Sequence, residues 1–122
     1  MINSVLIIIT IVFTVLAQLI LKVGAGTFYF PKALSYAELL KMAACNLSNV
    51  YVIGSILFTL FGGLAWILVV QNMPLSRAYP IMSLNYVVIF LLSWCLFGEH
   101  LSSYALFGMG LIIIGTCFLG FK

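Results

Sequence analysis

Four long apolar stretches follow one another along the chain, at residues 2–22, 48–70, 77–97 and 103–121. Each is about 20 residues long, the length at which an α-helix crosses roughly 30 Å of hydrocarbon. Lipid offers no partner to an unpaired backbone group, and a closed barrel would need many more strands. The pattern therefore predicts four transmembrane helices.

The connection between the first two stretches has a different pattern. Gly24 and Gly26 are expected to end the first helix, and Pro31 can open a new one. Polar residues then recur at every third position, with apolar residues on the other faces; they are Lys32, Ser35, Glu38 and Lys41. We predict a short amphipathic helix over about 31–45 that lies at the membrane surface.

Composition supports a membrane protein. Apolar residues make up 66% of the 122 residues and charged residues only 6%, whereas a soluble domain is about half apolar and about a quarter charged. The chain is thus predicted to be a single all-α transmembrane domain over residues 1–122. The net charge of +3 comes from scattered basic residues, which argues against nucleic acid as a partner.

Few residues suit catalysis or metal binding. The chain has one histidine, two acidic residues and three cysteines, without a CxxC spacing. No nucleophile–base pair and no metal-ligand set can be assembled from them, and an odd number of thiols argues against a disulfide framework. We expect neither an enzyme, nor a cofactor, nor a bound metal.

In the first stretch, TIVFTVLAQLILK carries a polar residue at every fourth position: Thr10, Thr14, Gln18 and Lys22. On an ideal helix this stripe drifts by about 40° per step, so it winds across a broad face. Threonine can hydrogen-bond to its own helix backbone, and Thr10 is therefore expected to be structural. Gln18 and Lys22 are the stronger candidates for contacts with a substrate.

The third stretch carries the densest chemistry, in PLSRAYPIMSLNY. Pro80 has no N–H and crowds the carbonyl four residues earlier, so we predict a kink there that can act as a hinge. Tyr79 and Ser83 lie roughly on one helix face. Asn85 lies nearly on the opposite face, where it needs a second partner surface such as another helix.

Three further residues each have two interpretations. Arg77, near the membrane boundary, could grip a phosphate with two hydrogen bonds or extend to the lipid headgroups. Glu99 could titrate during transport or terminate a helix at the interface. Trp66 could contact a substrate or belong to the aromatic belt of the membrane surface.

Small residues predict where helices approach one another closely. Ser55, Thr59 and Gly63 are spaced by four in the second stretch, and Gly108 and Gly115 by seven in the fourth. Glycine is also simply common in membrane helices. Because four helices enclose too little space for a solute path, we expect a dimer, formed by two copies or with a similar subunit.

The segment ILVVQNMPLSRAYPIMSLNYVVIFLLSWCLFGEHLSSYALFGMGLIIIG resembles the drug/metabolite transporter superfamily, in its four-helix small multidrug resistance branch. Its GEHLSSYALFGMGLIIIG part is similar to that superfamily's end-of-half signature. More narrowly, the positions Leu68–Gln71, Pro74, Ala78–Pro80 and Ser83–Asn85, with AQLILK in the first stretch, resemble the small subunits that flip aminoarabinose-phosphoundecaprenol across the bacterial inner membrane.

Two departures bear on what this resemblance implies. Proton-coupled multidrug exporters of that branch carry a glutamate in the first helix, and Thr14 stands at its position here. The flippase subunits also lack this acid, so its absence favours them. Ser76 and Arg77 stand where those subunits carry a small or apolar residue, and a cation suits a lipid that bears a phosphate.

The leading hypothesis is a transporter subunit that moves a polyprenyl-phosphate-linked sugar, such as an aminosugar, across the bacterial inner membrane. Its polar groove would be lined by Thr14, Gln18, Lys22, Tyr79, Ser83 and Asn85. Lys22 and Arg77 would compensate the phosphate. Two alternatives stay open: a small-molecule exporter that uses Glu99 for coupling, and a non-transporting membrane partner of a glycosyltransferase.

Overall fold

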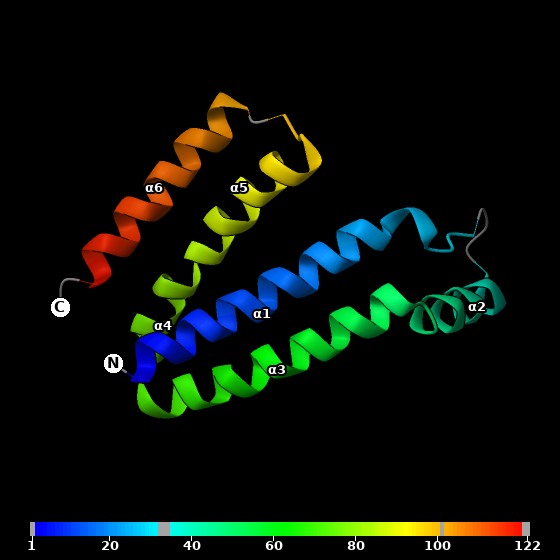
Figure 1. Cartoon of the computed structure of the whole chain (residues 1–122), viewed down its shortest axis with the longest axis horizontal. Helices are drawn as coiled ribbons and strands as arrows, with labels where there is room; N and C mark the ends of the chain where they lie inside the picture. The colour runs from blue at the N-terminus through cyan, green and yellow to red at the C-terminus, as the bar shows by residue number, and fades with distance from the viewer. Residues whose placement is uncertain (1, 32–34, 101, 121–122) are drawn as a thin grey trace.

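The computed structural model describes residues 2–31, 35–100 and 102–120, and its regular elements are all helical (Figure 1). The prediction of an all-α chain is therefore confirmed for these residues. The elements in chain order are α1 (Ile2–Gly24), a single 3₁₀ turn η1 (Ala25–Thr27), α2 (Tyr36–Leu47), α3 (Val50–Asn72), α4 (Leu75–Met82), α5 (Leu84–Phe97) and α6 (Ser103–Gly120).

Three stretches of the described residues are long and apolar enough to cross a membrane: Ile2–Thr27, Val50–Asn72 and Leu75–Phe97. A fourth apolar helix, Ser103–Leu119, is shorter. Helix α6 has 18 residues, which at 1.5 Å per residue extend for about 27 Å, slightly less than a typical hydrocarbon core. The fourth span stays a prediction.

Helix α3 begins at Val50, two residues later than expected. The side chain of Asn49 accepts a hydrogen bond from the backbone N–H of Tyr51 over 2.9 Å and so caps the helix. Ser48 instead belongs to the end of α2, where its N–H donates to the carbonyl of Ala44. The two helices therefore meet at a sharp boundary.

The predicted start of the amphipathic helix at Pro31 is wrong, because α2 begins at Tyr36. Lys32, part of the predicted pattern, lies outside the described residues. The side chain of Asn46 in α2 accepts from the N–H of Tyr29 and donates to the carbonyl of the same residue. This pair holds Tyr29 against α2.

The third apolar stretch is broken into α4 and α5 at Ser83, three residues after the predicted kink at Pro80. Pro80 itself lies inside α4. The N–H of Ser83 donates to the carbonyls of both Tyr79 and Pro80, at 3.0 and 3.2 Å, and its own carbonyl accepts from Tyr86. The predicted kink at Pro80 is therefore corrected: α4 continues through Pro80, and the helical stretch is interrupted at Ser83.

Helices α1 and α3 lie side by side over most of their length, as Figure 1 shows. A Cβ atom on Gly62 of α3 would stand 3.3 Å from the Cβ of Phe13 on α1, so the missing side chain allows this close approach. The buried residues of the pair are Ile7, Thr10, Val15, Ala17, Gly24, Ser55, Gly62, Ala65 and Val69.

Helices α5 and α6 form a second, looser hairpin that diverges from the α1–α3 pair (Figure 1). Gly98 ends α5 in the left-handed region, at φ 63°, and its N–H donates to the carbonyl of Trp94. In α5 only Asn85 is buried, and Ser103–Leu119 of α6 contain no buried residue. Helix α4 joins the two hairpins, since Ala78 packs with Ile7 and Val69.

Candidate functional site

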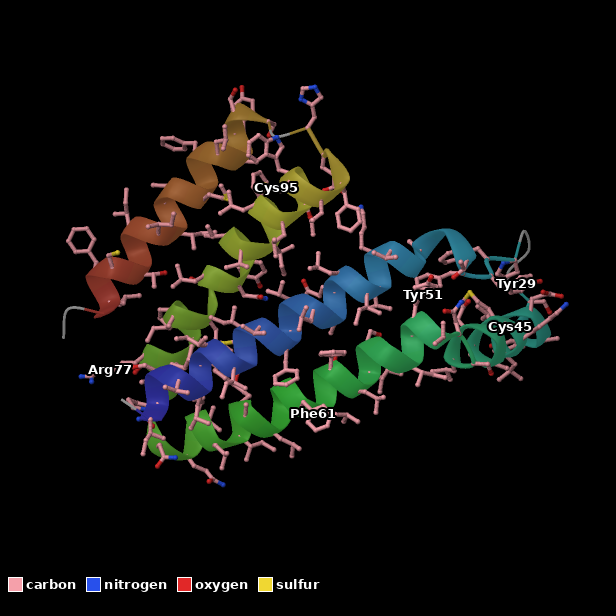
Figure 2. All side chains as sticks on the ribbon, viewed as in Figure 1. Tyr29, Cys45, Tyr51, Phe61, Arg77 and Cys95 are labelled. Carbon is pink, nitrogen blue, oxygen red and sulfur yellow. The ribbon has the colours of Figure 1, made fainter. Side chains whose placement is uncertain are left out.

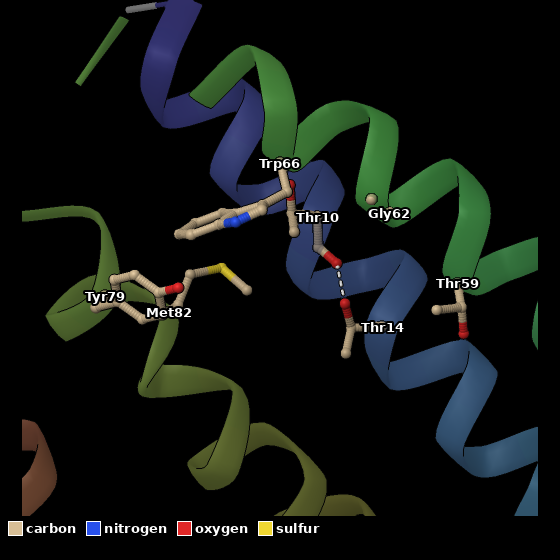
Figure 3. Close-up of a pocket in the computed structure, with 8 residues that line it drawn as sticks. Thr10, Thr14, Thr59, Gly62, Trp66, Tyr79 and Met82 are labelled. Carbon is tan, nitrogen blue, oxygen red and sulfur yellow. Dashed lines mark hydrogen bonds between the residues drawn. The ribbon is translucent and has the colours of Figure 1, made fainter. Parts of the chain in front are cut away.

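A cavity of about 260 Å³ lies where α1, α3 and α4 meet (Figure 3). Trp66 and Tyr79 line it and contact each other edge to face, with their ring centroids 5.3 Å apart. Tyr79 comes from α4, which packs against α1 and α3 through Ala78. The lining residues are Thr10, Thr14, Thr59, Gly62, Gly63, Trp66, Tyr79 and Met82.

The polar groups of this first cavity are all neutral. Thr14 donates to the carbonyl of Thr10 at 2.8 Å, as Figure 3 shows, and Thr10 donates to Leu6 at 2.9 Å. Thr59 likewise donates to Ser55. The three threonine protons are used within their own helices, so these hydroxyl oxygens remain as acceptors for a ligand. The indole N–H of Trp66 and the hydroxyl of Tyr79 add donors, and the cavity contains no ionised group.

A second cavity of about 240 Å³ surrounds the helix break. Tyr79 and Met82 line both cavities, so the two adjoin. The other lining residues are Ser83, Asn85 and Tyr86. Asn85 is buried, and its Oδ1 has no hydrogen-bond partner among the described residues. The second partner surface expected for Asn85 is thus not found in this part of the chain.

Thr116 of α6, which the sequence did not single out, holds α6 against the break. Its hydroxyl lies 2.8 Å from the carbonyl of Ile112 in its own helix, 3.1 Å from the carbonyl of Pro80 and 3.1 Å from the hydroxyl of Ser83. Ser83 also donates to the same Pro80 carbonyl. The sequence signal was a lone threonine in the middle of an apolar helix. Its contact with Pro80 could not be foreseen, because it joins residues 36 positions apart.

A third cavity, of about 570 Å³, lies between α1 and α5. Its walls are apolar throughout, in contrast to the first cavity on the other side of α1. The lining residues are Ile8, Ile11, Val12, Val15, Leu16, Leu19, Leu84, Val88 and Leu92. Helix α1 therefore separates a cavity that contains hydroxyl groups from a larger one suited to hydrocarbon.

The two basic residues predicted to compensate a phosphate lie far apart. Ala78, the neighbour of Arg77, packs with Ile7 near the start of α1, whereas Lys22 is close to its end. From residue 7 to residue 22 the helix rises by about 22 Å at 1.5 Å per residue. Arg77 is exposed beside the first turns of α1, as Figure 2 shows. One phosphate cannot contact both side chains at once.

Lys22 forms an ion pair with Glu99, and its Nζ lies 5.7 Å from the centre of the Phe97 ring. The two charged side chains are 51% and 43% exposed. This pair joins the end of α1 to the turn between α5 and α6. Glu99, the predicted coupling residue, is thus a surface carboxylate with a basic partner rather than a buried one.

The remaining predicted residues are spread over other surfaces. Gln18 is exposed and lines none of the three cavities. Ser55 is buried in α3, whereas a Cβ on Gly63, Gly108 or Gly115 would meet nothing within 4 Å. A packing role for these three glycines therefore stays a prediction about contacts outside this chain.

A hydrogen-bonded cluster closes the end of the molecule that carries α2, where Figure 2 labels Tyr29, Cys45 and Tyr51. The hydroxyl of Tyr29 donates to Glu38 at 2.9 Å, and Lys41 lies 5.5 Å from its ring centre. The hydrogen bond to Glu38 and, to a smaller extent, desolvation and the charge of Glu38 raise the pKa of Tyr29 above its ordinary 10.0.

The sequence is similar to those of proteins named as probable 4-amino-4-deoxy-L-arabinose-phosphoundecaprenol flippase subunit ArnE. The relative from Aeromonas hydrophila is 38% identical over 80 residues, which cover 62% of this chain and 70% of the relative. The one from Pseudomonas fluorescens is 45% identical over 65 residues, or 52% and 57% of the two chains. The one from Pectobacterium atrosepticum is 44% identical over 54 residues, or 44% and 48%.

The matched segments thus span from about half to 70% of the length of these curated relatives. No family model and no solved structure matches this chain.

Proposed function

Because this chain belongs to the family of 4-amino-4-deoxy-L-arabinose-phosphoundecaprenol flippase subunits, we propose that it is a subunit of a transporter that flips a polyprenyl-phosphate-linked sugar across the bacterial inner membrane. The sugar is an aminosugar, as in the names of the relatives. The chain binds and moves this lipid without making or breaking covalent bonds.

The observation that carries the proposal is the division of cavities around α1. The first cavity presents the hydroxyls of Thr10, Thr14 and Thr59 and the ring of Tyr79. The third cavity, on the other side of α1, is larger and apolar. A polyprenyl-linked sugar has the same two parts, a polar head and a hydrocarbon chain. A site of this kind can let the polar head pass between helices while the polyprenyl tail remains in lipid.

The four apolar stretches all cross the membrane in this proposal, and α2 lies at its surface. Arg77 then stands near one face and Lys22 near the other. The phosphate meets them one after the other, at the start and the end of its passage. At the second face the phosphate competes with Glu99 for Lys22.

The functional unit contains a second subunit. Helices α5 and α6 leave an open side, since a Cβ on Gly108, Gly110 or Gly115 of α6 would meet nothing within 4 Å. The relatives are named as subunits, which fits an assembly with a second copy or with a similar chain. Tyr79, Ser83 and Asn85 then line a path that is completed by the partner.

The test uses a bacterium that lacks its own subunit of this family but keeps the rest of the transport system. Membrane vesicles with and without this chain are treated with a membrane-impermeant amine reagent. The labelled fraction of the lipid-linked aminosugar is measured by mass spectrometry. We expect this chain to raise the labelled fraction, and the double variant Lys22→Ala with Arg77→Ala to abolish most of the gain.

Labelling that stays at the level of the deleted strain would refute the proposal. If the same cells instead gain drug resistance that a Glu99→Gln variant loses, the chain is a small-molecule exporter. Co-purification with a glycosyltransferase, without any gain in labelling, would identify a non-transporting partner of that enzyme. Transport that survives the double variant would refute only the phosphate role of the two basic residues.

A further inference from the structure

The side-chain amide of Asn85 is a buried polar group without a partner. The residue is 9% exposed, and its Oδ1 makes no hydrogen bond within the described part of the chain. The other buried polar side chains, Thr10 and Ser55, each donate to a carbonyl of their own helix. The Oδ1 of Asn85 can only accept, so it cannot bond to a helix carbonyl as these hydroxyls do, and an unmet buried acceptor lowers stability.

The cavity beside Asn85 has the size and the lining of a binding site for a small polar group. Its volume of about 240 Å³ equals that of about eight water molecules, far more than a single bridging water needs. Two tyrosines, Tyr79 and Tyr86, are largely exposed at 61% and 65% and supply aromatic walls with polar ends. Binding sites commonly combine such apolar walls with a few polar groups that fix orientation.

The amide of Asn85 can offer the cavity either an acceptor or a donor. Its terminal torsion is broad and roughly two-fold, so half a turn exchanges the oxygen with the NH₂ group. The hydroxyl of Ser83 is fixed at the same place by Pro80 and Thr116. A hydroxyl or amino group that enters the cavity therefore meets two polar side chains held by the helix break.

We propose that Asn85 is a sugar-recognition residue, whose amide hydrogen-bonds to a hydroxyl or amino group of the transported head group in the cavity of Tyr79, Ser83 and Tyr86. This inference rests on the proposed function and adds the side-chain amide that recognises the sugar by hydrogen bonding. The phosphate makes no use of this cavity, which contains no basic residue. Asn85 thus distinguishes a sugar-bearing lipid from the bare polyprenyl phosphate.

The experiment compares two ligands on the full chain purified in detergent together with its partner subunit. The thermal unfolding midpoint is measured with the polyprenyl-phosphate-linked aminosugar and with polyprenyl phosphate alone. We expect the sugar to add to the stabilisation of the wild type. In Asn85→Leu the affinity for the sugar-bearing lipid should fall about tenfold and become equal to the affinity for the bare phosphate lipid. The affinity for the bare phosphate lipid should be the same as in the wild type.

Two matched variants accompany Asn85→Leu. Asn72→Leu replaces an exposed asparagine whose side chain donates to Leu68 at the end of α3, and it should keep the wild-type preference for the sugar. Asn85→Ser keeps a polar group with both donor and acceptor and should restore part of the preference. Without ligand, Asn85→Leu should unfold at the same or a higher temperature, because it removes an unmet polar group.

Three results would overturn the inference. If Asn85→Leu keeps the full preference for the sugar while the wild type transports it, the residue does not read the sugar, and the proposed function stands. If Asn85→Leu lowers the midpoint and separates the subunits, the amide is satisfied by the partner. If the wild type neither transports the sugar-bearing lipid nor prefers it to the bare phosphate lipid, the proposed function fails and the inference with it.

Discussion

Two helix pairs in this chain are built from similar residues but packed to different degrees. The pair α1–α3 is in contact along its length and holds nearly all buried residues of the chain. The pair α5–α6 is joined at its turn, Thr116 links α6 to Pro80 of α4 and to Ser83, and the described residues of the pair are mostly only partly buried or exposed. Both pairs contain glycines, yet among the described ones only Gly24, Gly54 and Gly62, all in the first pair, lie against a neighbouring helix.

The difference shows that a small residue allows close helix packing only where another helix lies opposite it. Gly62 allows α1 to approach, whereas its neighbour Gly63 faces open space. In lipid, hydrocarbon surface has no need to be buried, so helices associate where close packing and hydrogen bonds make it favourable. The first pair is complete within this chain, and the second keeps its faces for lipid, substrate or another subunit.

The largest effect is expected from breaking the tight pair at its end. A Cβ atom on Gly24 would lie 2.5 Å from the Cβ of Tyr51 on α3, and neither atom can turn away. Gly24→Ala should therefore lower the free energy of unfolding by about 1–3 kcal/mol, measured by thermal unfolding in detergent. Gly26→Ala is the control, because a Cβ there meets nothing within 4 Å; equal effects of the two would disprove the packing argument.

A smaller loss should follow when the looser pair is detached from the helix break. Thr116→Val keeps the shape of the side chain but removes the hydroxyl that contacts Pro80 and Ser83. We expect a loss of about 1 kcal/mol and a wider spread of α4–α6 distances between spin labels. Thr59→Val should change little, since that hydroxyl bonds only within α3. An unchanged distance distribution for Thr116→Val would contradict the role of this contact.

The ion pair that bridges the two helix pairs should contribute less. Lys22 and Glu99 are both about half exposed, and pairs of that kind give about 0.2–1 kcal/mol. A double-mutant cycle with Lys22→Gln and Glu99→Gln should show a coupling energy in this range that falls as salt is added. Arg77→Gln with Glu99→Gln serves as a control pair without coupling. A coupling that is insensitive to salt would exclude a surface interaction.

The smallest effect concerns the cluster beside α2, outside both pairs. The pKa of Tyr29 is raised by its hydrogen bond to Glu38, so the bond is present below pH 10 and is lost as the pH rises through the higher pKa of the folded chain. The absorbance difference between wild type and Tyr29→Phe should therefore titrate above pH 10. A midpoint at or below 10 would show that the hydrogen bond is absent in solution.

Local properties of the sequence were enough to predict the helices. Runs of about 20 apolar residues located three stretches long enough to cross a membrane and a shorter fourth helix, and a distortion in PLSRAYPIMSLNY followed from Pro80. The position of this distortion did not follow, because a proline removes one backbone hydrogen bond but does not determine at which residue the helix is interrupted. The interruption lies at Ser83, whose hydroxyl contacts Thr116 of α6, and this contact exists only in the folded chain. The contact between Asn46 and Tyr29 was missed for the same reason, since it joins residues 17 positions apart.

The candidate site was predictable by residue type but not by arrangement. Tyr79, Ser83 and Asn85 do line one cavity, although helix periodicity had placed Asn85 nearly opposite the other two. Lys22 and Arg77 were assigned to the same phosphate because both are basic, yet they lie near opposite ends of α1. The pairing of Lys22 with Glu99 joins residues 77 positions apart, and no periodicity in the sequence encodes such a contact.

The compact first pair also has a consequence for how the protein is made. Its two helices and the cluster around α2 are complete once residue 72 has been synthesised, and chains generally begin to fold from their N-terminal parts during synthesis. Helices α1 and α3 can thus associate while α4 to α6 are still being translated. The later helices then enter the bilayer beside the associated α1–α3 pair and can pack either against it or against a partner subunit. The order of synthesis therefore favours assembly with other chains.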